Sequence, residues 1–505
     1  MATVNRHGHA AGQQIAKRLD VLGHLQSGCF GVSWWFVRVF FVAGGVWVMA
    51  AAHSISFAYL VNSLESDFPM SKSERAVVGG TISLGTFVGA FFFGNLADLR
   101  GRKFALLIAF AIAHTATALS AVARSVEVFG TLRFIVGIGL GGEQPIIVAL
   151  IMELAPANIR GRALVYLDAF SAIGSILTVL LCRDLEPLIG WRVLFVCNIA
   201  ALLYLPLIYY VIPESPKWLA NAGYYQEAVT VLRSIEKASS VFHGEDADNA
   251  IYSLQLCDDT RHTIQAHEVP LRKAVLDRAR ILLQYPYLAR TLMLWVVWSG
   301  MSMSNAATLV YLGGDFLRSV LNRGEESLVV YASMVAQLFG NLVAAALIDR
   351  IGRRCSIVCG LIVASAASLL QVYLDPGLLT ILLSSCLRNF AFTGAWGCLY
   401  AYTPELYPLT VRVVGISYAW GISRIGAFAG PFTVVLAIQQ FQLSTAVIMW
   451  IFCSLSFCVA IVLLVLGIET APYATEKRRS TGMDSRNGGE ALVLAYVKHE
   501  EGEKV

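Results

Sequence analysis

The stretch GNLADLRGRK, from Gly94 to Lys103, places one acid and three bases between two almost purely apolar segments. The segment AVVGGTISLGTFVGAFFF precedes it, and FALLIAFAIAHTATALSAVA follows it. An apolar run of about 20 residues is long enough to cross the hydrocarbon core of a bilayer as a helix. We therefore interpret the charged stretch as a tight turn between two membrane-spanning helices.

The same pattern occurs a second time in the distal part of the chain. AALIDRIGRR, from Ala345 to Arg354, aligns Asp349 with Asp98 at a shift of 251 residues. An independent pair, ELAPANIRG from Glu153 and ELYPLTVRV from Glu405, matches at a shift of 252 residues. Two matches at nearly the same shift indicate two duplicated halves.

The composition assigns the chain to the integral membrane proteins. Of its 505 residues, 57% are hydrophobic and 14% are charged, and the mean hydropathy is +0.64. Soluble domains contain about 25% charged residues, so this chain has too few to cover a water-facing surface. The net charge of +4 and the ten scattered cysteines add little, because no CxxC or Cys/His cluster occurs. We expect no disulfide framework, no metal site and no cofactor.

About twelve apolar runs are long enough to span a bilayer. They cover residues 34–62, 75–97, 103–123, 127–153, 161–182, 191–212, 288–316, 327–348, 354–374, 377–403, 413–437 and 443–468. Because an isolated segment in lipid must satisfy its own backbone, these runs are predicted to be helices. The expected fold is an all-α membrane protein with twelve transmembrane helices in two pseudo-symmetric six-helix halves.

The division of the chain and its orientation follow from the same runs. We expect an N-terminal tail (1–33), a first half (34–212), a central loop with short helices (213–287), a second half (288–468) and a disordered tail (469–505). Basic residues concentrate in the loops after the second, fourth, eighth and tenth runs, among them Arg102, Arg160, Arg353 and Arg412. The positive-inside rule then places both termini and the central loop in the cytoplasm, with the plasma membrane as the expected location.

Three longer motifs carry a resemblance to a known family. The pattern G-x-L-x-D-x-x-G-R-[RK] and its repeat resemble the signature loop of the major facilitator superfamily. The stretch from Arg133 to Ala163 resembles that superfamily's fourth span, and PESPKWL (Pro213 to Leu219) resembles the motif after its sixth span. The resemblance covers residues 34 to 470 and implies transport of a small solute by alternating access.

Further motifs narrow the branch. YAYTPELYPLTVRVVGISYAWGISRIGAFAGPF, from Tyr400 to Phe432, is similar to the synaptic-vesicle-protein-related transporters. GGEQP with the following RGRALVYLDAFSAIG is similar to bacterial niacin transporters of the sugar-porter-like organic ion branch. The expected seventh span, LWVVWSGMSMSNAATLVYLGGDFL, lacks the glutamines of sugar porters, which disfavours a hexose carrier.

The resemblance also implies a gate at the duplicated motifs. In the family such clusters are thought to hold the two halves together when the carrier faces outward. The candidate gating residues are Asp98, Arg102, Glu153, Arg160, Asp349, Arg353, Glu405 and Arg412. Exposed ion pairs contribute about 0–1 kcal/mol each, a suitable size for a gate. The alternative is that the bases merely fix the topology.

Three charged residues lie inside expected spans. An ionised group at the bilayer centre costs roughly 2.5–3.5 kcal/mol on insertion scales, so such groups normally face a cavity or a partner. Glu143 and Asp168 are candidate proton-binding or coupling residues, and Arg424 is a candidate for binding a carboxylate or phosphate. The alternative for all three is a structural ion pair among themselves.

Polar and aromatic residues of the seventh and tenth runs are candidates for the solute site. They are Trp298, Asn305 and Tyr311 in the seventh run and Trp396 and Tyr400 in the tenth. These residues are suited to a flat solute, although aromatic residues also form belts at the membrane interface.

Four other polar residues are expected to have structural roles. His53 and His114 are interpreted as packing residues. Arg133 and Arg388 are expected to extend their charged groups to the membrane surface.

The sequence thus predicts a secondary active transporter that moves a small organic ion, with a niacin-like carboxylate as one candidate, by proton-coupled symport. The alternatives are a facilitative carrier of a sugar, an organic cation or phosphate, and a receptor without transport activity. No nucleotide-binding fingerprint, Ser/His/Asp set or HExxH motif occurs, so no enzymatic activity is expected. The expected partners are the solute, the proton and the bilayer, with no nucleic acid, and the expected state is a monomer.

Overall fold

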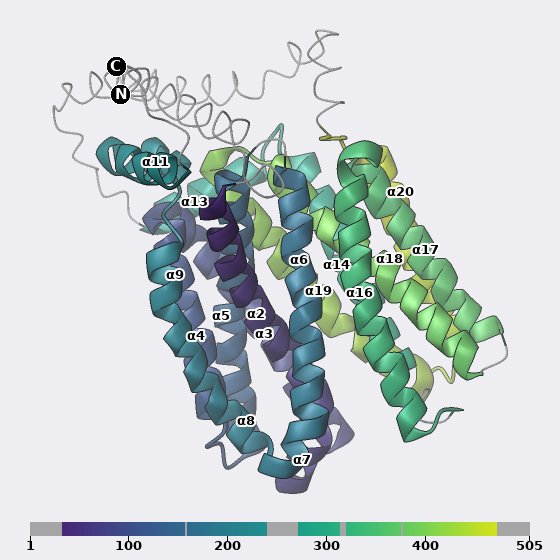
Figure 1. Cartoon of the computed structure of the whole chain (residues 1–505). Coiled ribbons are helices and arrows are strands. Elements are labelled where there is room, and N and C mark those ends of the chain that lie inside the picture. The colour runs from purple at the N-terminus through teal and green to yellow at the C-terminus, as the bar shows by residue number, and fades with distance from the viewer. Residues whose placement is uncertain (1–32, 157–158, 240–270, 314–319, 375–376, 472–505) are drawn as a thin grey trace.

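The computed structural model describes residues 33–156, 159–239, 271–313, 320–374 and 377–471 (Figure 1). Within these ranges all regular structure is helical. Eleven helical segments are long and apolar enough to cross a membrane. Helix α14 (Leu288–Gly313), which is 26 residues long, lies between the sixth and the eighth span. The predicted fold of twelve membrane helices in two halves is confirmed.

The first half contains five continuous spans and one interrupted span. The continuous spans are α2 (Trp34–Asp67), α3 (Lys72–Arg100), α4 (Arg102–Ser120), α5 (Val126–Leu154) and α6 (Arg160–Leu180). A π-helical turn η2 (Leu181–Leu185) and the short α7 (Glu186–Ile189) extend α6. The sixth span consists of α8 (Trp191–Cys197), the 3-10 helix η3 (Asn198–Tyr204) and α9 (Leu205–Val211). Pro206 in the first turn of α9 has no amide hydrogen to donate, which accounts for the change of helix type before it.

The second half repeats this order with six spans. They are α14, α16 (Arg323–Ile351), α17 (Arg353–Tyr373), α18 (Leu378–Glu405), α19 (Arg412–Gln439) and α20 (Thr445–Leu466). A 3-10 turn η4 (Leu409–Val411) joins α18 to α19. Figure 1 shows the two groups of helices side by side, with the first half in purple to blue and the second in green to yellow.

Two glycines make the repeated turns possible. Gly101 separates α3 from α4 with φ +105°, and Gly352 separates α16 from α17 with φ +97°. Side chains rarely adopt this backbone conformation, whereas glycine adopts it without steric cost. The predicted tight turn at GNLADLRGRK is therefore present, and its duplicate has the same geometry. We call the end of the bundle that carries these two turns the basic end.

Glycines also allow α3 and α5 to cross in direct backbone contact. A Cβ atom on Gly85 would lie 2.0 Å from the carbonyl oxygen of Phe134, and one on Gly137 would lie 2.2 Å from that of Ile82. No real side chain fits at such distances. Helices in lipid associate largely through van der Waals contact, so small residues at a crossing permit close packing.

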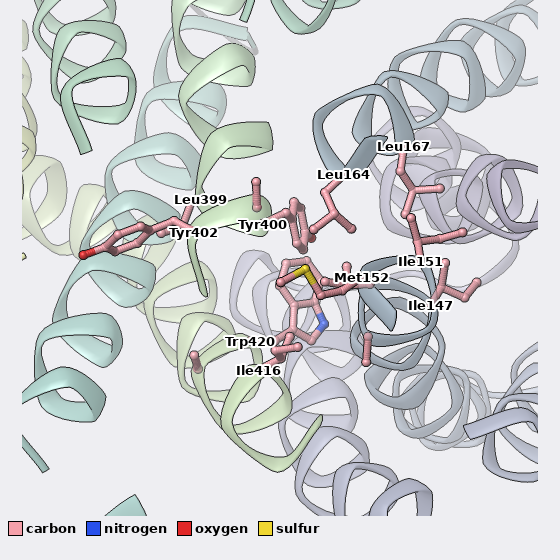
Figure 2. Packing of buried hydrophobic residues seen from close by; sticks show 14 of the residues in the cluster. Ile147, Ile151, Met152, Leu164, Leu167, Leu399, Tyr400, Tyr402, Ile416 and Trp420 are labelled. Atoms are coloured by element: carbon pink, nitrogen blue, oxygen red, sulfur yellow. The ribbon is translucent and has the colours of Figure 1, made fainter. Parts of the chain in front are cut away.

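The two halves meet along a shared apolar core. Helix α3 packs against α19, and α6 packs against α16. Figure 2 shows members of this core from both halves, including Met152 and Leu164 of the first half and Tyr400 and Trp420 of the second. A solute site between the halves would therefore be bordered by α5 and α6 on one side and by α18 and α19 on the other.

Three short helices lie at the basic end. They are α10 (Pro216–Asn221), α11 (Tyr225–Ser239) and α13 (Leu271–Leu282). The hydroxyl of Ser215 accepts a hydrogen bond from the amide of Trp218 at 3.2 Å, so it caps α10 as an N-cap serine does. The indole of Trp218 then donates to the carbonyl of Asp98 at 3.1 Å, which ties α10 to the end of α3.

Candidate solute site and the ion network at the basic end

An aromatic cluster occupies the boundary between the halves. The ring of Trp298 lies 5.2 Å from Trp396, 5.1 Å from Tyr400 and 5.5 Å from Trp420, mostly edge to face. The ring of Trp47 on α2 lies 5.2 Å from Tyr400 and brings the first half into the cluster. Three of the five predicted solute-site residues, Trp298, Trp396 and Tyr400, are therefore neighbours. All three belong to the second half, and Tyr400 contacts the first half through Trp47.

Asp168 on α6 lies at this boundary. It is 3% exposed, and one of its carboxylate oxygens accepts a hydrogen bond from the side-chain amide of Asn341 at 3.2 Å. Asn341 belongs to α16, so this contact joins the two halves. The sequence singled out Asp168 but gave no sign of Asn341, because an asparagine inside an apolar run has no distinctive pattern.

Arg424 on α19 contacts Trp420 of the cluster. Its guanidinium carbon is 3.6 Å from the ring centre of Trp420, a stacked arrangement that favours a cation. Among the described residues Arg424 forms no ion pair with Asp168 or Glu143. The structural ion pair considered as an alternative for these three residues is therefore not found.

Glu143 on α5 lies inside the first half. It is 0% exposed, and neither of its carboxylate oxygens has a hydrogen-bond partner within the described part of the chain. A buried carboxylate without a partner is costly, whereas the neutral carboxylic acid is tolerated more easily. The position suits a group that binds and releases a proton.

The remaining two predicted solute-site residues lie elsewhere or outside the description. Asn305 on α14 accepts a hydrogen bond from Arg388 at 3.3 Å. Tyr311 is part of α14, but its side chain lies outside what the structure describes. The cluster instead contains Trp47 and Trp420, which sequence reasoning missed because tryptophan in an apolar run has no distinctive spacing.

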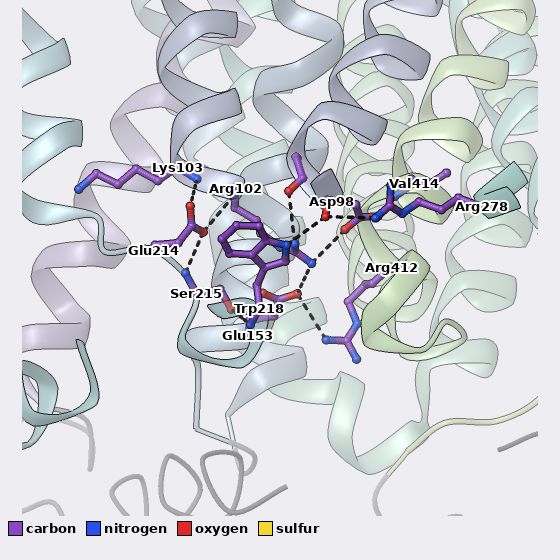
Figure 3. Close-up of polar contacts among 11 residues, drawn as sticks. Asp98, Arg102, Lys103, Glu153, Glu214, Ser215, Trp218, Arg278, Arg412 and Val414 are labelled. Atoms are coloured by element: carbon purple, nitrogen blue, oxygen red, sulfur yellow. Dashed lines mark hydrogen bonds and ion pairs between the residues drawn. The ribbon is translucent and has the colours of Figure 1, made fainter. Parts of the chain in front are cut away.

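The gating residues of the first half form a buried network (Figure 3). One oxygen of Asp98 lies 3.0 Å from the guanidinium of Arg102, and the other accepts the amide of Val414 at 3.1 Å. Val414 lies in the first turn of α19, so Asp98 caps a helix of the other half. Glu153 lies 3.4 Å from Arg102 and 3.7 Å from Arg412. This network holds the halves together at the basic end.

The duplicated network of the second half is more exposed. Arg353 contacts Asp349 at 2.9 Å and Glu405 at 3.3 Å. Asp349 also contacts Arg162 of the first half at 2.9 Å, and the side chains of this pair are 25% and 40% exposed. Arg160 donates to the carbonyl of Ala155 at 3.3 Å. The gating residues of the second half, Asp349, Arg353 and Glu405, therefore also lie together. They contact the first half through the partly exposed ion pair between Asp349 and Arg162.

Two acids that sequence reasoning missed cap the helices after the repeated turns. Glu214 accepts the amides of Arg102 and Lys103, both at 3.0 Å. Glu469 accepts the amides of Arg353 and Arg354 at 2.9 and 3.1 Å. Burial raises the pKa of Glu214, against the opposing effects of these amides and of Arg102. The sequence contained a sign of this shared role, because a glutamate follows the last membrane span of each half.

The structure corrects the expectation for two arginines. Arg133 is 1% exposed and donates to the carbonyl of His53 at 2.8 Å. Arg388 is 6% exposed. Neither reaches the membrane surface, because each is enclosed by neighbouring helices. His53 and His114 are buried and lie 3.4 Å apart between Nε2 and Nδ1, a packed arrangement within the first half.

Within the described part of the chain no group of three or more His, Cys, Asp or Glu side chains could hold a metal ion. The eight described cysteines are free thiols. The described residues thus form an aromatic cluster at the boundary of the halves and an ion network at the basic end.

Residues 34–478 match the family described as Sugar (and other) transporter. The chain is 30% identical over 436 residues to the niacin transporter NiaP of Acinetobacter baylyi, covering 85% of this chain and 93% of that protein. It is 25% identical to the synaptic vesicle 2-related protein of Rattus norvegicus, covering 92% of this chain and 82% of that protein.

A solved structure of the proton:xylose symporter XylE bound to 6-bromo-6-deoxy-D-glucose has the same fold, with a TM-score of 0.67 and 20% identity over 86% of this chain and 96% of XylE. The chain therefore belongs to the sugar (and other) transporter family of the major facilitator superfamily, and it is a multi-pass membrane transporter of small solutes rather than an enzyme.

Proposed function

We propose that the protein is a proton-coupled symporter of a small organic ion, with a niacin-like carboxylate as the first candidate. The observation that carries this proposal is the aromatic cluster at the boundary of the halves, with Arg424 stacked on its Trp420 and the buried Asp168 joined to the second half through Asn341. Indole and phenol rings suit a flat solute, and a guanidinium offers paired donors to a carboxylate. The name of the Acinetobacter relative supports a niacin-like solute.

Proton coupling is supported by Glu143. An ionised carboxylate costs roughly 2.5–3.5 kcal/mol at the bilayer centre. Without a partner Glu143 therefore carries a proton in this arrangement of the halves. Release of the proton would require that water or a cation reaches the carboxyl group inside the first half, through a rearrangement of the helices around α5 during the cycle. Alternation between these states would couple proton movement to solute movement.

The proposed orientation places the basic end in the cytoplasm. Its concentration of Arg and Lys side chains satisfies the positive-inside rule. The segments 1–33, 213–287 and 469–505 would then be cytoplasmic, and the carrier would act as a monomer in the plasma membrane. In that orientation the closed network around Asp98 corresponds to the outward-facing side of the cycle.

The test uses purified protein in liposomes. Uptake of labelled nicotinate is measured with an inward proton gradient, without a gradient, and with an ionophore that collapses it. Small acids, sugars, organic cations and phosphate follow as competitors. Glu143→Gln is compared with Glu127→Gln, a matched control because Glu127 is exposed in the first turn of the same helix.

Symport predicts gradient-driven uptake that is lost in Glu143→Gln and retained in Glu127→Gln. Uptake that ignores the gradient and survives in both variants would make the protein a facilitative carrier. Absence of uptake and of counterflow for every class of solute would favour a receptor without transport activity.

A further inference from the structure

A cleft of about 780 Å³ lies at the basic end of the first half. It is bordered by the end of α3, the start of α4, the end of α9, and helices α10 and α11. Figure 1 shows α11 over the end of α9, at the edge of the bundle that faces away from the second half. Ligand pockets typically have volumes of about 300–1,000 Å³, so the cleft has room for an organic group.

The cleft is open toward the bilayer. Tyr209 and Tyr210 in the last turn of α9 line it, and Tyr210 is 82% exposed. Phe104 in the first turn of α4 also lines the cleft and is exposed. Because α4 and α9 belong to membrane spans, exposed apolar side chains at their ends contact lipid. Tyrosine is typical of the membrane interface, so the cleft lies where phospholipid headgroups meet their acyl chains.

Two cations line the cleft at the first repeated turn. Arg100 is the last residue of α3, and Lys103 lies in the first turn of α4. Neither side chain forms an ion pair with any described residue. The Lys103 ammonium lies 4.4 Å from the ring centre of Tyr209, and Figure 3 shows it pointing away from Asp98. The two charges can therefore bind an anionic group such as a phosphate.

Two acids also line the cleft, Glu214 and Glu227. Glu214 accepts the backbone amides of Arg102, Lys103 and Ser215 at 2.9 to 3.0 Å, so its carboxylate already has partners. Glu227 in the first turn of α11 is exposed and forms no ion pair with any described residue.

The part of the cleft that α11 borders suits an organic cation. Tyr224, three residues before Glu227, lines the same cleft, and its ring is exposed. An aromatic ring and a carboxylate both attract an ammonium group. The lining thus offers cations for a phosphate and a carboxylate for an ammonium, and its two bases and two acids leave no net charge.

We propose that this cleft binds the headgroup of a zwitterionic phospholipid from the leaflet at the basic end. Arg100 and Lys103 bind the phosphate, Glu227 and Tyr224 bind the ammonium, and the acyl chains lie along the exposed faces of α4 and α9. A neutral lining with separated charges matches such a headgroup better than one with a net negative charge. The site depends neither on the transported solute nor on the orientation of the protein in the membrane.

The experiment uses native mass spectrometry of the delipidated full-length protein in detergent. Phosphatidylethanolamine, phosphatidylcholine, phosphatidylglycerol and diacylglycerol with the same acyl chains are titrated separately, together with glycerophosphoethanolamine, which has no acyl chains. The wild type should bind the two zwitterionic lipids more tightly than phosphatidylglycerol, and diacylglycerol most weakly.

Three variants test the assignment of the charges. Arg100→Gln combined with Lys103→Gln should weaken binding of phosphatidylethanolamine by about ten-fold or more, because charge-assisted hydrogen bonds to the phosphate are lost. Glu227→Gln should reduce the preference for phosphatidylethanolamine over phosphatidylglycerol. Arg350→Gln is the matched control, because Arg350 is exposed at the end of α16, the equivalent helix of the second half, and does not line the cleft.

Four results would overturn the proposal. Equal binding of phosphatidylethanolamine and diacylglycerol would mean that the acyl chains alone are recognised. Tighter binding of phosphatidylglycerol would mean that the cleft selects negative charge. Equal loss in Arg350→Gln would mean that surface charge in general attracts the lipid. Equally tight binding of glycerophosphoethanolamine would make the cleft a site for a water-soluble molecule. If the double variant does not fold, Glu227→Gln decides, since an unchanged lipid preference in that variant contradicts the proposal.

Discussion

Replacement of Asp98 by alanine is expected to open the basic end of the bundle far more often than replacement of Asp349. Both acids come from the repeated motif, but they join the halves differently. Asp98 is buried and accepts the amide of Val414 at the start of α19. Asp349 reaches the other half through an ion pair with Arg162 that is partly exposed.

The magnitudes follow from these environments. A hydrogen bond to a charged group contributes about 1.5–3 kcal/mol, and loss of about 2 kcal/mol shifts an equilibrium about 30-fold. An exposed ion pair contributes about 0–1 kcal/mol, which is a shift of about five-fold at most. The pairs of Asp98 with Arg102 and of Asp349 with Arg353 lie within one half. These two ion pairs remain when the halves separate. They therefore stabilise the closed and the open state equally and do not affect the equilibrium between the two states.

The assay is labelling of a cysteine at the closed interface. Ser417 on α19 is 0% exposed, and its side chain would contact a Cβ atom on Gly94 of α3. Ser417→Cys, in a background without other reactive cysteines, is labelled by a maleimide at a rate proportional to the open population when opening is fast. Equal acceleration by Asp98→Ala and Asp349→Ala, or greater acceleration by Asp349→Ala, would show that the buried contact of Asp98 with α19 is not the stronger link between the halves.

Three further predictions rest on single contacts. Arg424→Lys should reduce uptake although it keeps the charge, because lysine lacks the planar group that stacks on Trp420; unchanged initial rates would contradict this. Gly137→Val should abolish the monodisperse peak in size-exclusion chromatography, because its Cβ would lie 2.2 Å from the carbonyl of Ile82, whereas a folded variant would show that the crossing can adjust. Because burial raises the pKa of Glu214 above its ordinary value of 4.5, the folded state binds that proton more tightly and its ionisation opposes folding. The melting temperature of Glu214→Gln relative to wild type should therefore rise as pH increases above about 4.5 and then level off, and a pH-independent difference would contradict this.

The fold could be predicted from the sequence because its signals are local. Twelve apolar runs set the number of helices, and the repeated motif revealed the two halves. The glycine of each repeat fixed the turn, since Gly101 and Gly352 both have the positive φ that a side chain resists. Each of these properties depends on a few neighbouring residues or on a spacing along the chain.

The candidate site could be predicted in part. The charged residues in apolar runs were recognisable, because such groups are costly in a membrane. Their partners were not, since the rotation of each helix in the bundle decides which side chains meet. Asn341 joins Asp168 from 173 residues away, and Trp47 reaches Tyr400 across the two halves. The burial of Arg133 and Arg388 was mispredicted for the same reason.

The most direct test of proton-coupled transport is the lumenal pH of proteoliposomes that contain a trapped pH-sensitive dye. Nicotinate is added outside without an imposed gradient, and protein-free liposomes correct for passive entry of the neutral acid. Proton-coupled symport predicts that the lumen of wild-type proteoliposomes acidifies as labelled nicotinate enters, and that Glu143→Gln abolishes this acidification. Carrier-mediated entry of nicotinate at constant lumenal pH would contradict it.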